Sequence, residues 1–257
     1  MKATPSPKIR KMPGGKDRSS SQAARATLAL REMLVQGRFS PGERLREVPL
    51  AAELKVSRIP LHLALERLAY EGFLHLRSTR GFVVQGFSTE DIRDAIELRG
   101  LLEGAAARLA TARWQNLRDL EPLRESSREI VSLVRRRKLT IEAFSRYIEL
   151  NAQFHRGLLD LSRSRMLRRA VEQACSLPFA SPSAFLNRQH VSPELKELFV
   201  IAADQHILIV DAIADRDGMR AEFLTREHAR VARRNLDAVL KNRESVQHLT
   251  AAGLIHL

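Results

Sequence analysis

Residues 37–74 decide the fold and read GRFSPGERLREVPLAAELKVSRIPLHLALERLAYEGFL. One short helix is predicted over residues 47–54, and a second helix is predicted to begin after Ser57, a residue type that caps helix N-termini. Pro60 is tolerated in the first turn of that second helix, and Gly72 can end it. Two helices separated by a break of about three residues are typical of a helix-turn-helix.

The segments on either side extend this unit. On the C-terminal side, β-prone runs at 73–76 and 82–84 flank the basic turn RSTRG, which predicts a small two-stranded wing. On the N-terminal side, apolar residues recur at helical spacing over residues 23–36, and Gly37 follows them where a helix-ending glycine is expected. Residues 23–86 are therefore predicted to form a winged helix-turn-helix domain.

A helix-turn-helix reads DNA with the N-terminal end of its second helix, which enters the major groove. Arg58 is the residue type best suited to a bidentate contact with guanine, and Ser57 and Arg46 can bind phosphates. Arg77 and Arg80, at the wing turn, can reach the minor groove or the DNA backbone. Serine and arginine are also common at helix starts in general, so these residues alone leave a purely structural interpretation open.

Three motifs in this region occur together: PGxxLxE from Pro41, SRxPxxxAL from Ser57 and LxxEG from Leu68. With them, residues 23–86 resemble the winged-helix domain of GntR-type bacterial transcriptional regulators. The resemblance implies a homodimer that binds a palindromic operator in double-stranded DNA. His62 stands where the family usually has arginine, so one base or phosphate contact is expected to differ.

Composition agrees with a DNA-binding protein of two folded domains. The chain has 257 residues and a formal net charge of +13, and its first 90 residues hold 16 Lys or Arg against 8 Asp or Glu. Such a positive field attracts polyanions, either nucleic acid or an anionic membrane surface. The lone Cys175 excludes an internal disulfide, and neither a long apolar run nor a secretory signal is present, so a cytoplasmic protein is expected.

The two ends of the chain are expected to lie outside the folded domains. Residues 1–22 are rich in proline, glycine, serine and basic residues, which predicts a disordered basic tail, and residues 242–257 are expected to form a C-terminal tail. Residues 87–241 follow a helical pattern, so the fold class is mainly α, a winged helix followed by an all-α bundle. Helices are predicted from Ser88 or Thr89 to about residue 111, and at 117–137, 140–162, 164–176, 194–215 and 218–241.

Several polar residues fall within the apolar stripes of the predicted bundle helices. Any single histidine in such a stripe is most often a hydrogen-bonded core residue. Three histidines from separate helices favour instead a transition-metal site, because Zn²⁺ bound by three imidazoles with one open position is an established geometry. The polar residues concerned are Arg99, Asn151, His155, His206, His228 and Asn235.

The pattern NxxFH, which ends at His155, together with the QH pair at 205–206 and His228, strengthens this interpretation. Over residues 90–241 these positions resemble the FCD-type effector domain of the FadR subfamily of GntR regulators. The resemblance implies a ligand-responsive regulator, most often a repressor, in which a small carboxylate effector binds beside a divalent metal. The implied metal is Zn²⁺, with Ni²⁺ or another transition metal as alternatives.

The same resemblance assigns the site residue by residue. The resemblance implies that Arg99 anchors the carboxylate. Asn235, which shares a helix face with His228, is placed with Arg99 in the effector site. Many relatives have aspartate in place of Asn151, and a neutral amide is the weaker ligand for a cation. The implied metal ligands are Asn151, His155, His206 and His228.

Two other classes of protein compete with a regulator. In a metal-dependent enzyme acting on a small organic acid, the metal could activate water while Glu103, one turn from Arg99, served as a base. The attached DNA-binding domain disfavours this class, because it gives the pocket a sensing role without chemistry. A membrane-surface protein is also disfavoured, since the RRRK run at 135–138 is more simply the solvated C-terminal end of a helix.

Overall fold

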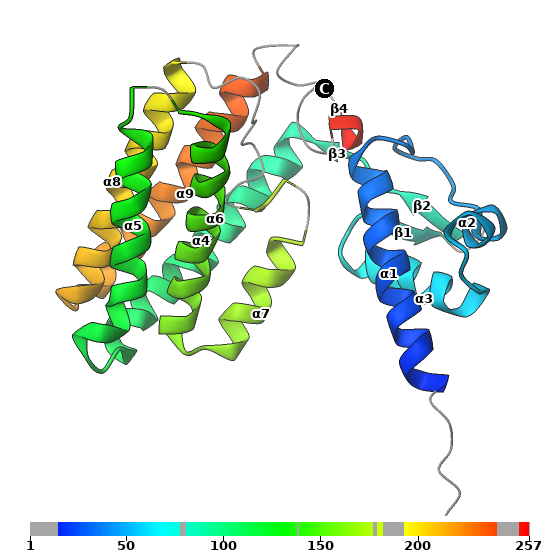
Figure 1. Cartoon of the computed structure of the whole chain (residues 1–257), viewed down its shortest axis with the longest axis horizontal. Coiled ribbons are helices and arrows are strands. Elements are labelled where there is room, and N and C mark those ends of the chain that lie inside the picture. Colours follow the sequence, from blue (N-terminus) through cyan, green and yellow to red (C-terminus); the bar gives the residue numbers. More distant parts are fainter. Residues whose placement is uncertain are drawn as a thin grey trace, which may run out of the picture.

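The computed structural model describes residues 15–77, 81–137, 139–176, 179–181, 193–240 and 252–256. It consists of a winged helix and a helical bundle, joined where β3 (Phe87–Ser88) leads directly into α4 (Thr89–Arg113) (Figure 1). The prediction of a mainly α protein with a small β wing is confirmed. None of the described helices is long and apolar enough to cross a membrane.

The body of the winged helix is formed by α1 (Gly15–Val35), α2 (Glu47–Leu54) and α3 (Arg58–Tyr70). The end of α1 follows the prediction, because Gly37 has a φ of 73° and the next N–H, of Arg38, donates back to the Met33 carbonyl at 3.0 Å. The turn between α2 and α3 places Lys55 in the left-handed region, with a φ of 52°. The core of the domain is built on fully buried leucines at positions 30, 34, 61, 65 and 68.

The wing is a two-stranded antiparallel sheet formed by β1 (Leu74–Arg77) and β2 (Gly81–Val84). Both strands lie within about one residue of the predicted β-prone runs, and Arg44 extends the sheet by an isolated bridge to β2. Residues 78–80 of the turn lie outside the described residues, and so does the predicted DNA contact Arg80.

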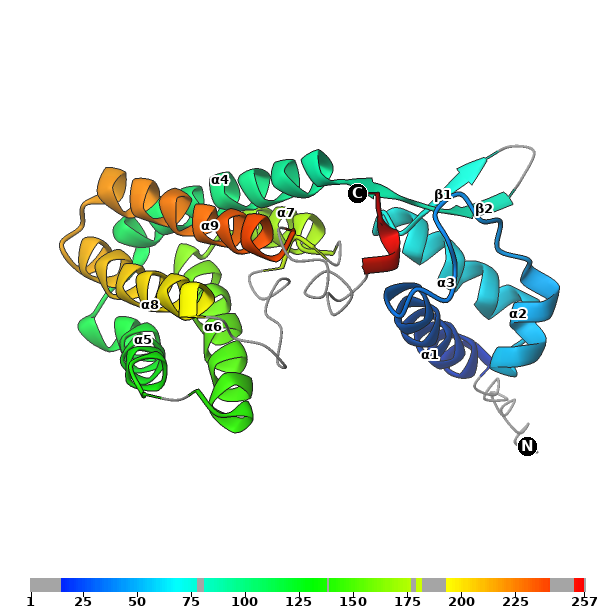
Figure 2. The same cartoon turned by 90° about the horizontal axis from the view of Figure 1, so that it is seen from above.

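The bundle begins with a capping box at the start of α4. The Ser88 hydroxyl accepts from the Asp91 N–H at 3.1 Å, and the Asp91 carboxylate accepts from the Ser88 N–H at 2.7 Å. Figure 2 shows α9 running along α4. The two helices approach closely at Gly100, where an added Cβ would lie only 2.7 Å from the Cβ of Ala229. The later elements fall close to the predicted ranges: η1 (Leu117–Leu120), α5 (Glu121–Val134), α6 (Ile141–Ser162), α7 (Arg165–Ala174), α8 (Pro193–Ala214) and α9 (Gly218–Leu240).

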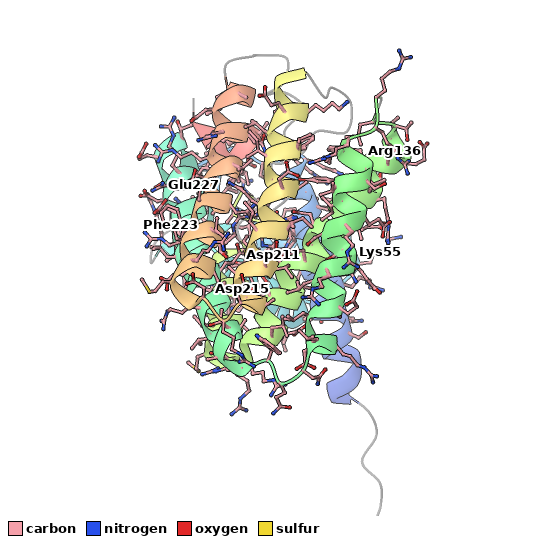
Figure 3. The ribbon with its side chains drawn as sticks, turned by 90° about the vertical axis from the view of Figure 1, so that its left-hand side faces the viewer. Lys55, Arg136, Asp211, Asp215, Phe223 and Glu227 are labelled. Atoms are coloured by element: carbon pink, nitrogen blue, oxygen red, sulfur yellow. The ribbon has the colours of Figure 1, made fainter. Side chains whose placement is uncertain are left out.

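Helices α8 and α9 form one outer side of the bundle. Figure 3 shows Asp211 on α8, Asp215 just after the end of that helix, and Phe223 and Glu227 on α9 along this side. Phe223 is 66% exposed, an unusual position for a phenylalanine, whereas the charged neighbours are what a solvated helix face normally carries.

The N-terminal expectation was wrong in one respect. Helix α1 begins at Gly15, so residues 15–22 are helical, although the sequence analysis assigns them to the disordered tail. No proline follows Pro13 before the buried face of the helix starts at Ala26, so nothing in the intervening serine- and alanine-rich stretch stops the helix from extending toward the N-terminus. Residues 1–14 lie outside the described residues.

The expectation of a C-terminal tail was also wrong for residues 252–256. They form η2 (Ala252–Leu254) and β4 (Ile255–His256), and β4 pairs in parallel with β3. Leu254 is fully buried in the core of the winged helix. The close approach depends on glycine, because a Cβ at Gly253 would lie 3.0 Å from the Cα of Gly37. Nothing in the local sequence indicates a partner for this short apolar segment.

Candidate functional site

The polar residues predicted to face the bundle interior are all buried, and none is more than 7% exposed. They lie on four helices that pack against one another, α4, α6, α8 and α9. Their helical spacing puts them on the inner faces, as predicted. They are Arg99 on α4, Asn151 and His155 on α6, His206 on α8, and His228 and Asn235 on α9.

The three histidines converge. One ring nitrogen from each of His155, His206 and His228 lies within 4.8 Å of the other two, and the Nε2 atoms of His206 and His228 are 3.1 Å apart. Phe154 stacks on the His206 ring with 4.0 Å between centroids, which fixes that ring. The Gln205 side-chain oxygen lies 3.2 Å from His228 Nδ1, so a proton at Nδ1 would leave the Nε2 lone pair facing the cluster.

Burial keeps two of these imidazoles neutral. Burial lowers the pKa of His228 to about 3, and the electrostatic interaction with His155 acts in the same direction. Burial, and then the neighbouring His228 and His155, lower the pKa of His206 well below its usual 6.5. Neutral imidazole is the form that binds a metal, so these rings do not have to lose a proton before binding.

Glu103 is a fully buried carboxylate between Arg99 and His155. Its Oε1 lies 3.0 Å from His155 Nδ1 and its Oε2 lies 3.7 Å from Arg99 Nε, although these contacts lack the alignment of hydrogen bonds. Burial alone would raise the pKa of Glu103, but the electrostatic interactions with His155 and Arg99 outweigh burial and lower the pKa to about 2. The site therefore contains one ionised carboxylate facing a guanidinium.

Arg99 and Asn235 present unpartnered polar atoms to the interior. Arg99 donates from Nη1 to the Ala180 carbonyl at 3.1 Å, but its Nε has no hydrogen-bond partner, and neither has Asn235 Oδ1. Leaving such atoms buried and unpaired costs about 1–3 kcal/mol each. These atoms are therefore suited to hydrogen bonds with a bound polar molecule.

The histidine cluster fits a divalent transition metal. Both ring nitrogens of His155 and Nδ1 of His206 are buried without a hydrogen-bond partner, which is the environment of ligand atoms rather than of satisfied core residues. Asn151 is buried one turn before His155 on the same helix, where its amide oxygen can complete the set. Imidazole ligands suit Zn²⁺ or Ni²⁺, whereas Mg²⁺ and Ca²⁺ prefer oxygen ligands.

The metal-free protein is expected to lose stability as the pH falls below 6.5. Folded His228 stays neutral down to a pKa of about 3, whereas the unfolded chain protonates this residue near pH 6.5. The unfolded state therefore binds more protons in this window, and the free energy of unfolding falls by about 1.4 kcal/mol per pH unit. The free energy of unfolding, measured with urea between pH 7 and 5 in EDTA, should depend less steeply on pH for His228→Gln than for the wild type. His62→Gln, an exposed control, should keep the wild-type slope, and equal slopes in all three would contradict the prediction.

The predicted DNA contacts of the winged helix lie on an exposed surface. Ser57 precedes α3 at the N-cap position, but its side chain makes no capping hydrogen bond, so the hydroxyl is not committed to the helix. Arg58 begins α3, and the neighbouring Ile59 is 72% exposed although it is apolar. Ile59 belongs to the end of the helix that is expected to meet base edges, and an exposed apolar residue here can meet a thymine methyl group. The exposed predicted contacts are Arg46, Ser57, Arg58, His62 and Arg77.

His62 has acidic neighbours that the sequence analysis missed. Its Nδ1 lies 3.4 Å from Glu47 and its Nε2 lies 3.6 Å from Glu66, which is one turn further along α3. These contacts become ion pairs only when the imidazole is protonated. The i, i+4 spacing of His62 and Glu66 was the signal that could have identified this pair.

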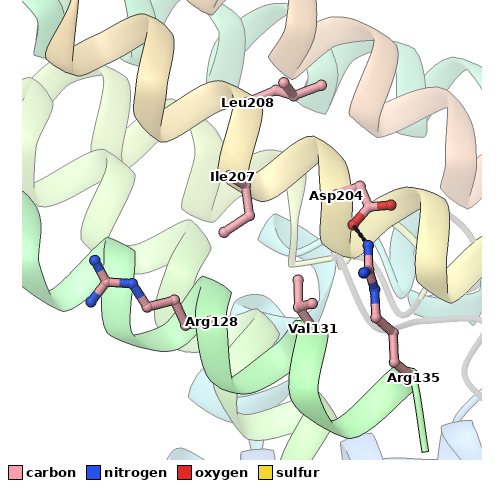
Figure 4. A pocket seen from close by; sticks show the side chains of 6 residues that line it. All are labelled: Arg128, Val131, Arg135, Asp204, Ile207 and Leu208. Atoms are coloured by element: carbon pink, nitrogen blue, oxygen red, sulfur yellow. Dashed lines mark hydrogen bonds and ion pairs between the residues drawn. The ribbon is translucent and has the colours of Figure 1, made fainter.

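An open groove of about 460 Å³ lies between α5 and α8, outside the histidine cluster (Figure 4). Its two arginines already pair with carboxylates: Arg135 with Asp204 at 2.8 Å and Arg128 with Glu121 at 3.3 Å. The groove therefore offers an incoming anion no unpaired cation among the described residues. Its lining consists of Arg128, Val131, Arg135, Asp204, Ile207 and Leu208.

The fold and the site together define a class of protein: a helix-turn-helix DNA-binding domain joined to a helical domain with a buried polar centre. Residues 22–84 match the family described as "Bacterial regulatory proteins, gntR family", and residues 94–231 match the FCD domain. The chain belongs to the GntR family and is a transcriptional regulator with an FCD domain. The family and the relatives below are regulators of transcription, so the enzyme alternative is not supported.

Named relatives are of the same kind. The chain is 33% identical to the Nta operon transcriptional regulator of Aminobacter aminovorans over 72% of this chain and 80% of that protein. It is 28% identical to the probable D-xylose utilization operon transcriptional repressor of Paenarthrobacter nicotinovorans, over 82% and 90% of the two chains. The solved structure of E. coli McbR/YncC shares the fold, with a TM-score of 0.56 at 20% identity over 86% of this chain and 97% of that one.

Proposed function

We propose that this regulator is a ligand-responsive repressor that acts as a homodimer on a palindromic operator in the cytoplasm and senses a small carboxylate in a metal-containing pocket. The observation that carries the proposal is the buried cluster of three imidazoles beside the guanidinium of Arg99. Structural histidines would find hydrogen-bond partners inside the protein, whereas several ring nitrogens here have none.

The proposed metal ligands are Asn151, His155, His206 and His228. Zn²⁺ is the first candidate and Ni²⁺ the second, because both accept several imidazoles. When bound, the metal would supply a positive charge and a coordination position open to an anionic oxygen. Imidazole and amide ligands are neutral, so they leave the metal charge uncompensated, and Glu103, beside His155, provides a negative charge.

The proposed effector is a small carboxylate held by Arg99 and Asn235. A guanidinium binds a carboxylate through two parallel hydrogen bonds, and the unpartnered Nε of Arg99 is available for one of them. The Asn235 side chain can contribute an amide donor or acceptor. Because Glu103 would repel an anion, the positive charges of Arg99 and the metal are both needed to bind it.

The proposed operator contacts are the exposed residues of the recognition helix, its flanks and the wing. Dimer formation is supported by large apolar side chains on the exposed sides of α4 and α9: Leu98 is 50%, Leu101 41% and Phe223 66% exposed. A two-fold dimer would present two recognition helices to matching half-sites. The contacts proposed from this chain are Arg46, Ser57, Arg58, His62, Arg77 and Arg80.

Arg58→Ala is expected to weaken binding to an operator duplex, selected from a random library on the wild-type protein, by about 1–3 kcal/mol. The variant should also lose sequence preference at one base position in each half-site, because a bidentate contact to guanine distinguishes that base from the others. Fluorescence anisotropy measures the affinity, and sedimentation of the complex tests for two chains per duplex. Arg128→Ala, on an exposed arginine of α5, is the matched control. Unchanged operator affinity in Arg58→Ala would contradict the assignment.

Malonate, a small dicarboxylate, is expected to bind the metal-loaded protein and to bind Arg99→Gln at least about tenfold more weakly, because hydrogen bonds to a charged group contribute about 1.5–3 kcal/mol. Isothermal titration calorimetry at constant ionic strength measures both affinities, and metal analysis checks that the variant retains its metal. Arg128→Ala should bind malonate like the wild type. Equal binding by Arg99→Gln would contradict the role of Arg99, and no binding by the wild type would exclude malonate-like effectors.

A further inference from the structure

The proposed effector arginine is hydrogen-bonded to a segment that leaves the bundle. Arg99 Nη1 donates to the carbonyl of Ala180, which is fully buried, and the other polar contact of that carbonyl is the Cys175 thiol at 3.8 Å. A thiol is a weak donor. The guanidinium is therefore the principal hydrogen-bond partner of the Ala180 carbonyl among the described residues.

The end of α7, which precedes Ala180 in the sequence, contacts the C-terminal end of the recognition helix α3. The Gln173 amide donates to the Tyr70 carbonyl at 2.9 Å. The Ser176 hydroxyl shares its proton between the Gln173 carbonyl at 2.7 Å and the Glu71 carbonyl at 3.1 Å. The Tyr70 and Glu71 carbonyls lie at the end of α3, where no further helical N–H is available to bind them. Figure 1 shows α7 on the side of the bundle nearest to the winged helix. We call Gln173, Ser176, Phe179 and Ala180 the α7 exit.

A ring contact joins the α7 exit to the linker between the domains. Phe179 packs edge-on against Phe87 of β3 with 5.2 Å between ring centroids, and both rings are buried. The end of α3 is also fixed within the winged helix, because the buried Glu71 carboxylate accepts from Arg31 at 2.5 Å and from Arg67 at 2.7 Å. A displacement of the α7 exit would therefore act on a rigid recognition helix rather than on a loose end.

We propose that the α7 exit couples the effector site to the recognition helix: a carboxylate bound at Arg99 draws the guanidinium away from the Ala180 carbonyl, and the α7 exit then loosens its hold on the end of α3. This inference rests on the proposed function, and it adds the route by which effector binding changes the affinity for the operator.

The direction of the change follows from the charges in the site. A hydrogen bond from a guanidinium to a carboxylate is roughly twice as strong as one to a neutral carbonyl, so an incoming carboxylate outcompetes Ala180. Glu103 reinforces this preference, because a second anion beside it requires the Arg99 charge. The abandoned carbonyl is buried with only a weak thiol nearby, so its segment must rearrange to find a new partner.

The first experiment needs no effector. Amide hydrogen exchange of the full-length protein is measured in peptides covering residues 67–76 for the wild type, Arg99→Gln and the control Glu172→Ala, an exposed neighbour of Gln173 on α7. Arg99→Gln should speed exchange at this end of α3 by about fivefold, corresponding to the loss of one hydrogen bond. Unchanged exchange in a folded Arg99→Gln, with faster exchange confined to the bundle, would overturn the proposal.

A second variant keeps the test open if Arg99→Gln fails to fold. Gln173→Ala/Ser176→Ala removes the contacts to α3 and the local hydrogen bond from Ser176 to the Gln173 carbonyl, but it leaves Arg99 and Ala180 unchanged. The rate at which iodoacetamide alkylates Cys175 reports on the packing next to Ala180. This rate should rise about fivefold over that of Glu172→Ala, because the α7 exit has lost its anchorage to α3. Equal rates in the two variants would overturn the proposal.

A third measurement separates this inference from the proposed function. Malonate is titrated against the operator complex of the wild type, Glu172→Ala and Gln173→Ala/Ser176→Ala, with the operator affinity as the readout. The wild type and Glu172→Ala should respond to malonate, whereas the double variant should bind malonate normally and lose most of the response. A full response in the double variant would overturn the coupling. No malonate binding by the wild type would count against the proposed function alone, and the exchange and alkylation results would then decide the coupling.

Discussion

His206→Ala is expected to lose the bound metal and to melt roughly 10 °C below the wild type. The fully buried imidazole is one of three whose nitrogens converge within 4.8 Å. A metal present at about a thousand times its Kd stabilises the folded state by about 4 kcal/mol, and each kcal/mol shifts the melting temperature of a chain of this size by about 2–4 °C. Metal content per chain after dialysis and a thermal scan measure the two effects.

The controls separate metal loss from a simple packing defect. In EDTA the difference in melting temperature between wild type and His206→Ala should shrink, because only the space left beside Phe154 then distinguishes them. His62→Ala, on the exposed face of α3, should retain full metal content. His228→Ala should behave like His206→Ala. Equal metal content in the wild type and both cluster variants, or none in the freshly purified wild type, would show that these histidines are ordinary core residues.

The convergence of the histidines could be predicted from the sequence because it depends mainly on helical phase. His155, His206 and His228 each occupy the apolar stripe of a long helix, and the inner faces of packed helices have to meet. Helix boundaries could also be predicted from the sequence, because residues such as Ser88, Thr140 and Ser164 cap their helices through side-chain hydrogen bonds.

The rest of the site depends on contacts that local sequence does not encode. Glu103 was considered only as a base in the enzyme alternative, although its spacing of four residues from Arg99 on one face of α4 indicated a buried pair. The partner of Arg99 could not have been predicted, because Ala180 contributes a backbone carbonyl and any residue type carries one. The contacts of Gln173 and Ser176 with the end of α3 likewise use backbone acceptors, so no side-chain pattern marks them.

The C-terminal segment shows the same limit for the fold. Residues 252–256 are too few to display a period, so an apolar segment at the end of the chain resembles a tail in sequence. In the structure Leu254 fills the core shared with α1, and Ile255 pairs with Phe87 of β3. The junction between the two domains is thus contacted both by Phe179 of the α7 exit and by β4. The winged helix is not complete without residues from the far end of the chain.

Leu254→Ala is therefore expected to destabilise the winged helix by about 3 kcal/mol, which is the cost of a buried leucine-to-alanine cavity, although only three residues follow it in the sequence. Leu76→Ala is the matched control, because Leu76 lies on the wing and is 67% exposed, so its substitution should change stability by less than about 0.5 kcal/mol. Urea unfolding followed by hydrogen exchange in α1 and β3 measures the loss and locates it. If the C-terminal segment only lies on the surface, the two variants should have the same stability. If it completes the core, Leu254→Ala should speed hydrogen exchange in α1 and β3 together.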